Sequence, residues 1–405
     1  MIDQDLVRSD TPACLHQVFL DSAGSSLPPE PVVTAVVSHI RREAEVGGYV
    51  AADERAADLA GLKVSLGGLL GFGPGSVALT DSATRAWTQF FYSIPLHAGD
   101  RILISEAEYA SNAVAALQRA RMSGATVDIV PSDDTGQIDL SMLDAMLDER
   151  VRLVSLVHVP TNGGLVNPVR EVVDLAHQHG ALVLLDACQS VGQLSVNVNE
   201  LPVDALTATG RKWLRGPRGT GFLYIRPDVL EVLEPAAIDV QGATWHEPFR
   251  YELRDDATRF EFWEADVAGR LGLKAAVDYL LDLGLDNVER AVNHNAAYLR
   301  RLLSSIPNVQ VRDLGRTRCG IVSCTVDGFD PVDVRDALAN DSITVTVSGR
   351  TSTLLDMSAR NLNGVVRMSP HYFVTEAQLD LAAEAVARLV SRGLPTHPTS
   401  AETPR

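Results

Sequence analysis

The sequence predicts an α/β protein in which a mostly parallel seven-stranded sheet is sandwiched by helices and followed by a small α+β C-terminal domain. Short, mostly continuous apolar runs are typical of strands covered on both faces. They alternate with amphipathic helical patterns, which favours right-handed crossovers between parallel strands. The seven runs lie at 77–80, 101–105, 127–130, 153–157, 182–186, 205–208 and 221–225, with helical patterns at 112–122, 140–147 and 169–179.

A second set of patterns follows a long helical stretch at about 265–283. Strands are predicted at 310–314, 321–326, 343–347 and 365–369, and helices at 331–339 and 376–391. We therefore expect four parts: an N-terminal segment packing on the small domain (1–45), a large domain (46–264), a small domain (265–392) and a disordered tail rich in Pro, Thr and Ser (393–405).

Composition narrows the class of protein. With 405 residues and 46% hydrophobic residues, the chain can bury a large core. A formal charge of −17 opposes binding to nucleic acid, which needs clustered Lys and Arg. No apolar stretch is long enough for a membrane span and no signal-peptide pattern opens the chain, so we expect a cytoplasmic protein without membrane contact. The four cysteines show neither CxxC nor Cys/His spacing, so no disulfide framework or metal site is expected.

Lys212 and Asp186 form the most informative pair. Asp186 ends the apolar run at 182–186, and Lys212 follows the run at 205–208 within Thr209-Gly210-Arg211-Lys212-Trp213. A lysine can form a Schiff base with the aldehyde of pyridoxal 5'-phosphate (PLP), while an aspartate on the pyridine nitrogen keeps the ring protonated. The ordered pair, with a short strand between its members, predicts a PLP site in which Lys212 is catalytic.

The order of motifs resembles the class V aminotransferase family of fold type I PLP enzymes, over roughly 19–376. This family includes cysteine desulfurases, isopenicillin N epimerase-like proteins and ergothioneine-pathway C–S lyases. The resemblance implies that Ser82, Ala83 and Thr84 form the phosphate turn at a helix N-terminus. Taken alone, the same residues could be a simple N-cap. Thr209 and Arg211 are also expected at the phosphate, Arg211 standing where the family more often has histidine.

Three more cofactor contacts follow from the resemblance. Tyr109 occupies the position of the residue that stacks on the pyridine ring. Gln189 is expected to hydrogen-bond the phenolic oxygen of the cofactor. Asn162 is expected near the same oxygen, although Thr161 falls on the position where the family usually has asparagine.

The resemblance also implies a substrate site. Arg367, within Val366-Arg367-Met368-Ser369, is expected to bind the α-carboxylate of an amino acid through its planar fork. Ala23 lies in a segment whose backbone lines the substrate mouth, and Tyr49 could face the substrate. Trp263 and Glu264 lie in the stretch through which a neighbouring subunit completes the site, which predicts a homodimer.

The reaction is the harder inference. Cysteine desulfurases carry a nucleophilic cysteine on a small-domain loop, but the corresponding stretch at 347–354 has none. Cys319 and Cys324 lie on apolar strands and are expected to be inert. This leaves β-elimination, epimerisation, oxidative deamination and transamination.

The segment at 45–50 and Tyr109 favour β-elimination. We expect a C–S β-lyase that cleaves an S-substituted cysteine to thiol, pyruvate and ammonia in secondary-metabolite or antibiotic biosynthesis. The alternative is decarboxylation-coupled oxidative deamination of the same conjugate, as in similar lincosamide-pathway enzymes. A non-catalytic PLP-fold protein is disfavoured because Lys212, Asp186 and Arg367 are all present, and a nucleotide-binding enzyme because no phosphate-loop motif occurs.

Overall fold

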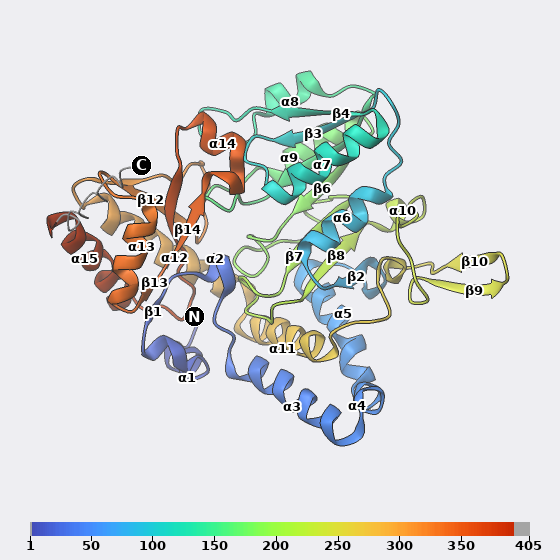
Figure 1. The fold of residues 1–405 in the computed structure, drawn as a ribbon, viewed down its shortest axis with the longest axis horizontal. Coiled ribbons are helices and arrows are strands. Elements are labelled where there is room, and N and C mark those ends of the chain that lie inside the picture. Colours follow the sequence, from blue (N-terminus) through green and yellow to red (C-terminus); the bar gives the residue numbers. More distant parts are fainter. Residues whose placement is uncertain (1, 393–405) are drawn as a thin grey trace, which may run out of the picture.

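A seven-stranded mixed sheet forms the centre of the molecule in the computed structural model, which describes residues 2–392 (Figure 1). The strand order is β2-β8-β7-β6-β5-β3-β4. β8 alone runs opposite to the other six strands, so the predicted mostly parallel sheet is confirmed. The strands are β2 (Val77–Thr80), β3 (Arg101–Ser105), β4 (Thr126–Val130), β5 (Val151–Val157), β6 (Leu182–Asp186), β7 (Ala205–Thr209) and β8 (Gly221–Ile225).

The apolar runs form strands because both faces of this sheet are buried. In β6, Val183 and Leu185 pack into one hydrophobic core and Leu184 into the other, as the period-two alternation of side chains requires. Helices α6 (Ala83–Ser93) and α7 (Ala110–Ser123) cover the second core. The first core is covered by α5 (Ala56–Leu70), α8 (Leu140–Met146), α9 (Val169–Gln178) and α11 (Val267–Leu283).

The parallel strands end at one edge of the sheet. Asp186, the last residue of β6, lies level with Val157 on β5 and Thr207 on β7. The chain therefore places the loops after β3, β5, β6 and β7 side by side, where ligands bind in open α/β sheets.

A four-stranded antiparallel sheet of order β11-β12-β15-β14 forms the small domain. Its strands are β11 (Val309–Val311), β12 (Val322–Val326), β14 (Thr346–Gly349) and β15 (Gly364–Met368), and its helices are α12 (Leu285–Ser304), α13 (Pro331–Asn340), α14 (Leu354–Ala359) and α15 (Glu376–Arg392). The expected strand at 343–347 is interrupted. Its first residues form β13 (Ile343–Thr344), which pairs in parallel with β1 (Val18–Phe19) from the N-terminal segment.

The N-terminal segment contacts both domains. Beyond α1 (Gln4–Ser9) and α2 (Ser22–Ser25), α3 (Glu30–Val46) leaves the small domain and packs along α11, followed by α4 (Gly48–Glu54). The boundaries drawn from the sequence stay a prediction, and the predicted tail at 393–405 lies outside the described residues.

Sequence patterns did not predict α3, α12 or the hairpin of β9 (Ala243–Glu247) and β10 (Arg250–Leu253). This hairpin projects from the large domain (Figure 1), and its residues Trp245, Phe249 and Tyr251 are exposed. Among residues 2–392, no helix is long and apolar enough to span a membrane.

Arg215 joins the N-terminal segment, the loop after Lys212 and the small domain. Its guanidinium is buried and donates to the Leu27 carbonyl (2.8 Å), the Tyr372 hydroxyl (2.7 Å) and the Thr11 hydroxyl (2.6 Å). It also lies over the rings of Tyr372 and Phe373. Neutral acceptors and aromatic faces thus replace the carboxylate that usually accompanies a buried arginine.

We predict that Arg215→Met lowers the free energy of unfolding by about 3 kcal/mol, because three acceptors lose a charged donor in a buried site. Arg335→Met, on an exposed residue paired with its neighbour Asp336, should change it by less than about 0.5 kcal/mol. Urea unfolding measures both. Equal values for the two variants would show that Arg215 does not hold these segments together.

Candidate functional site

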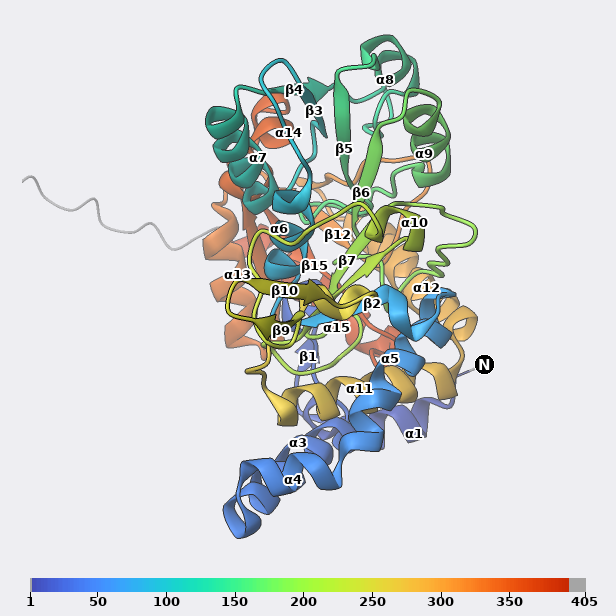
Figure 2. The same ribbon diagram turned by 90° about the vertical axis from the view of Figure 1, so that its right-hand side faces the viewer.

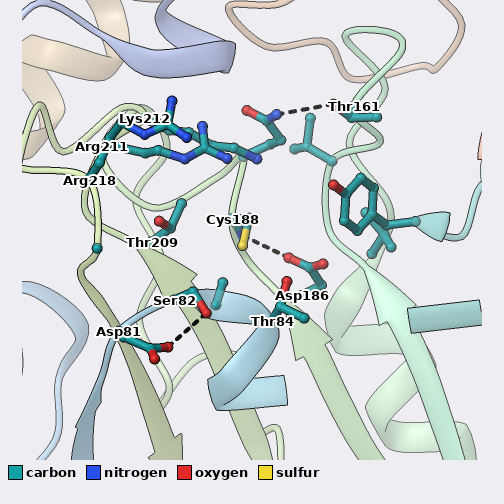
Figure 3. Close-up of a pocket in the computed structure, with 16 residues that line it drawn as sticks. Asp81, Ser82, Thr84, Thr161, Asp186, Cys188, Thr209, Arg211, Lys212 and Arg218 are labelled. Carbon is teal, nitrogen blue, oxygen red and sulfur yellow. Dashed lines mark hydrogen bonds between the residues drawn. The ribbon is translucent and has the colours of Figure 1, made fainter. Parts of the chain in front are cut away.

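A cavity of about 200 Å³ lies at the carboxyl edge of the large sheet. Nine of the residues predicted from the sequence line it: Ser82, Ala83, Thr84, Tyr109, Asp186, Gln189, Thr209, Arg211 and Lys212. They come from four loops that are distant in sequence. Figure 3 shows the loop of Arg211 and Lys212 on one side of the cavity, with Ser82 and Thr84 on the turn from β2 into α6.

Lys212 carries the only lysine amine in the cavity. Burial lowers the pKa of this amine, and the nearby Cys188 and Asp186 act in the opposite direction. The other two lysines of the chain are held in ion pairs, Lys63 with Glu261 and Lys274 with Asp278. A buried amine with a lowered pKa is more often neutral, and a neutral amine is a nucleophile and a base.

Asp186 presents its carboxylate at the tip of β6. Oδ2 accepts a hydrogen bond from Asn112 Nδ2 (3.0 Å), and Oδ1 accepts one from the backbone N–H of Cys188 (3.0 Å; Figure 3). These two donors fix the orientation of the carboxylate, which is 7% exposed.

The turn at residues 82–84 begins α6. Ser82 caps the helix by accepting from Arg85 N (3.2 Å), and the first N–H groups of a helix have no intrahelical acceptor. Gly221 of β8 backs this turn: a Cβ there would lie 2.6 Å from the Ser82 carbonyl carbon and 2.8 Å from Ala83 N. Thr209 completes this end of the cavity, its hydroxyl donating to the Thr220 carbonyl (3.1 Å).

Tyr109 and Gln189 border the rest of the cavity. Tyr109 precedes α7 and is 37% exposed. Gln189 is already engaged, because Nε2 donates to the Ala23 carbonyl (3.0 Å) and Oε1 accepts from Trp213 Nε1 (3.0 Å). Its predicted contact with the cofactor stays a prediction.

The structure corrects the expected position of Asn162. Its side chain points away from the cavity and donates to Asp356 Oδ2 of α14 (2.6 Å). Neighbouring residues of this turn face opposite sides, so Thr161 lines the cavity instead. The position where the family usually has asparagine therefore faces the site, and it carries a threonine here.

Arg367 lies next to the cavity lining and not on it. Nη1 donates to the Thr161 hydroxyl (2.8 Å), and Nη2 pairs with Asp21 Oδ1 (3.1 Å). Ala23 is also set back, since it is fully buried and meets the site only through the carbonyl that accepts from Gln189. Arg211 lines the cavity and donates to the Gly24 carbonyl.

Tyr49 does not reach the Lys212 cavity of its own chain, contrary to the simplest form of the expectation. It is 80% exposed and lines a separate hollow with Trp263 and Glu264. The rings of Tyr49 and Trp263 lie 5.9 Å apart. The reason is that α4 sits at the far end of α3, remote in the fold from the sheet edge (Figure 2).

Sequence reasoning assigned no role to four polar residues that line the cavity, although it noted the position of Thr161: Asp81, Thr161, Cys188 and Arg218. Cys188 is the most consequential because it is a thiol beside Asp186 and Lys212. Burial and the Asp186 charge raise its pKa well above the usual value. The sequence signal that could have identified Cys188 as a cavity residue is its position two residues after Asp186, where β6 ends.

The residues present fit PLP. The cavity combines a buried amine, a fixed carboxylate and a helix N-terminus, which match the aldehyde, the ring nitrogen and the phosphate. This fold and site define a fold type I PLP-dependent enzyme.

The family model described as Aminotransferase class-V matches residues 18–381, and the chain belongs to this family. Its cofactor is PLP. A probable cysteine desulfurase of Methanothermobacter thermautotrophicus is 28% identical over 393 residues, which are 96% of this chain and 98% of that protein. The apo structure of a cysteine desulfurase from Thermococcus onnurineus NA1 superposes with a TM-score of 0.89 at 25% identity, covering 97% of this chain and 99% of that one.

A structure of C-DES has the same fold, with a TM-score of 0.86 at 23% identity over 96% of this chain and 99% of that one. It is a lysine-to-alanine variant with glycine covalently linked to the PLP cofactor. These comparisons confirm the predicted family, fold class and cofactor. They leave the roles of individual side chains as proposals.

We predict that borohydride reduction of the holoenzyme fixes the cofactor on Lys212 with one label per chain, because this amine alone among the three lysines is free of an ion pair. Peptide mapping by mass spectrometry measures the position. A label on Lys63 or Lys274 would contradict the assignment.

Proposed function

We propose that this protein is a C–S β-lyase that converts an S-substituted cysteine and water into a thiol, pyruvate and ammonia. One observation carries the proposal: the cavity is lined by the Lys212 amine, whose pKa is lowered, and by the Cys188 thiol, whose pKa is raised. The site therefore favours proton removal by Lys212 over nucleophilic attack by a cysteine. The relatives named cysteine desulfurase support a substrate of the cysteine type.

Bound PLP supplies an electron-accepting ring that stabilises negative charge at Cα. In the proposed reaction Lys212 Nζ takes the Cα proton, and the Cβ–S bond breaks with its electron pair leaving on sulfur as a thiolate. The Asp186 carboxylate, held by two donors, would face the ring nitrogen and favour its protonated form. Tyr109 covers one side of the cavity and limits entry of water.

Arg367 is proposed to bind the α-carboxylate of the substrate. Its Nε is buried and has no hydrogen-bond partner within residues 2–392. Its Nη groups contact Thr161, which lines the cavity, and Asp21. A substrate carboxylate would use the free N–H or exchange with the Asp21 carboxylate, whose pKa burial already raises.

A desulfurase reaction is the main competitor, because it needs a thiolate that accepts sulfur. Burial raises the pKa of Cys319 to about 11 and of Cys324 to about 12, and Cys14 is also buried with a raised pKa. The loop at 347–354 has no cysteine. Cys188 is the single thiol that lines the cavity, so it is the residue on which this alternative depends.

The wider setting is also proposed. The resemblance of the segment at 45–50 to C–S lyases supports small-molecule biosynthesis, such as that of an antibiotic. A homodimer is supported by the exposed aromatic residues Trp245, Phe249 and Tyr251 of the hairpin and by the hollow of Tyr49 and Trp263, because large exposed apolar patches mark interfaces.

We predict that purified holoenzyme given an S-substituted cysteine releases equimolar thiol, pyruvate and ammonia, detected by mass spectrometry and coupled assays. Lys212→Ala should lower the rate on the order of 10²- to 10⁴-fold, because it removes the general base. Cys188→Ser and the pair Cys319→Ala with Cys324→Ala should retain most of the activity.

Other products would contradict this reaction. Persulfide on Cys188, with loss of sulfur release in Cys188→Ser, would favour the desulfurase reaction. Carbon dioxide with an S-linked aldehyde would favour oxidative decarboxylation, and a keto acid or a D-amino acid that retains the thioether would favour transamination or epimerisation.

We predict that Arg367→Lys weakens substrate binding by about 2–5 kcal/mol, because lysine lacks the planar fork. The absorbance spectrum of the bound cofactor should stay unchanged, since Arg367 lies outside the cofactor cavity. Asp21→Asn is the matched control for the ion pair. An unchanged KM in Arg367→Lys would remove this arginine from the substrate site.

A further inference from the structure

Glu108 is a buried carboxyl that the proposed reaction does not use. It lies on the loop between β3 and α7, is 3% exposed and does not line the cavity. Three donors surround it. Oε1 accepts from the backbone N–H of Tyr109 (2.8 Å) and from Asn112 Nδ2 (3.0 Å), and Oε2 accepts from the Ser155 hydroxyl (2.8 Å).

The Asn112 amide connects this carboxyl to the cavity. Its nitrogen donates to Glu108 Oε1 and to Asp186 Oδ2, both at 3.0 Å. A primary amide has two N–H groups, so one serves each carboxylate and neither remains free. Because the amide oxygen cannot replace the nitrogen without facing two acceptors, Glu108 and Asp186 together determine which way Asn112 points, and Glu108 holds the amide in place from outside the cavity.

We propose that Glu108 is a positioning residue that sets both the Asp186 carboxylate and Tyr109 through Asn112 and the Tyr109 backbone. The inference rests on the proposed role of Asp186 at the cofactor ring nitrogen. One buried carboxyl thereby aligns two parts of the cofactor site: Asp186 at the end of β6 and Tyr109 on the loop after β3.

The charge of Glu108 also favours a protonated ring nitrogen beside Asp186. No lysine or arginine is within hydrogen-bond reach of its carboxyl in the described residues, and burial together with the Asp186 charge raises its pKa to about 7. Two adjacent carboxyls in a buried site favour a cation beside them. A protonated ring nitrogen held by Asp186 would meet that requirement.

Asn112→Ala and Glu108→Ala should each raise the dissociation constant of PLP about tenfold or more, because a hydrogen bond to a charged group is lost. Titration of apoprotein with PLP measures this constant. The ¹⁵N chemical shift of the ring nitrogen in labelled PLP should move toward the unprotonated value. Glu108→Gln, which keeps the shape and removes the charge, should bind PLP more tightly than Glu108→Ala and should lower the pH at which the ring nitrogen loses its proton.

Ser155→Ala is the matched comparison, because it removes one contact of Glu108 that is not directed at Asp186; its ring nitrogen signal should move less than that of Glu108→Gln. Asp186→Ala is the reference for a lost carboxylate. If Asp186→Ala shifts the ring nitrogen while Asn112→Ala and Glu108→Gln, with wild-type melting temperatures, do not, the inference is wrong and the proposed role of Asp186 stands. If Asp186→Ala causes no shift, that role and the inference fail together.

Discussion

The burial of the Lys212 amine beside the Asp186 carboxylate is the constraint on which the rest of the site depends. A lysine and an aspartate cannot be desolvated together without groups that hold them in place. The backbone N–H of Cys188 and the Asn112 amide hold the carboxylate. Burial in turn lowers the pKa of the amine, so Lys212 loses its proton at a lower pH than an exposed lysine does.

The order of the strands in the sheet makes this arrangement possible. Asp186 ends a parallel strand, and Lys212 follows the adjacent strand, so the two residues meet although 26 positions separate them. Arg215 then anchors the loop that carries Lys212 to the N-terminal segment and the small domain. Arg215 thus links the small domain directly to the lysine loop.

The thiol of Cys188 shows why a residue type does not define a reaction. A cysteine in the site of a family that includes desulfurases suggests sulfur transfer. Its surroundings oppose this, because desolvation and the neighbouring Asp186 carboxylate raise the pKa of this thiol, so it keeps its proton. The surroundings of Arg367 matter in the same way. Asp21 and Thr161 already contact its guanidinium, so this arginine is not an unoccupied binding site for a carboxylate.

The sequence by itself determined the architecture and the cofactor pair. The strands could be predicted from continuous apolar runs because both faces of the sheet are buried. Asp186 and Lys212 could be recognised because one ends such a run and the other follows one. The tertiary structure alone decided which neighbouring side chain faces the cavity. Thr161 and not Asn162 lines it, and Tyr49 lies elsewhere, because a turn has no side-chain period and α4 is placed by packing at the end of α3. The network of Glu108, Asn112 and Ser155 was equally hidden, since its contacts join residues from a loop, a helix and a strand that only the fold brings together.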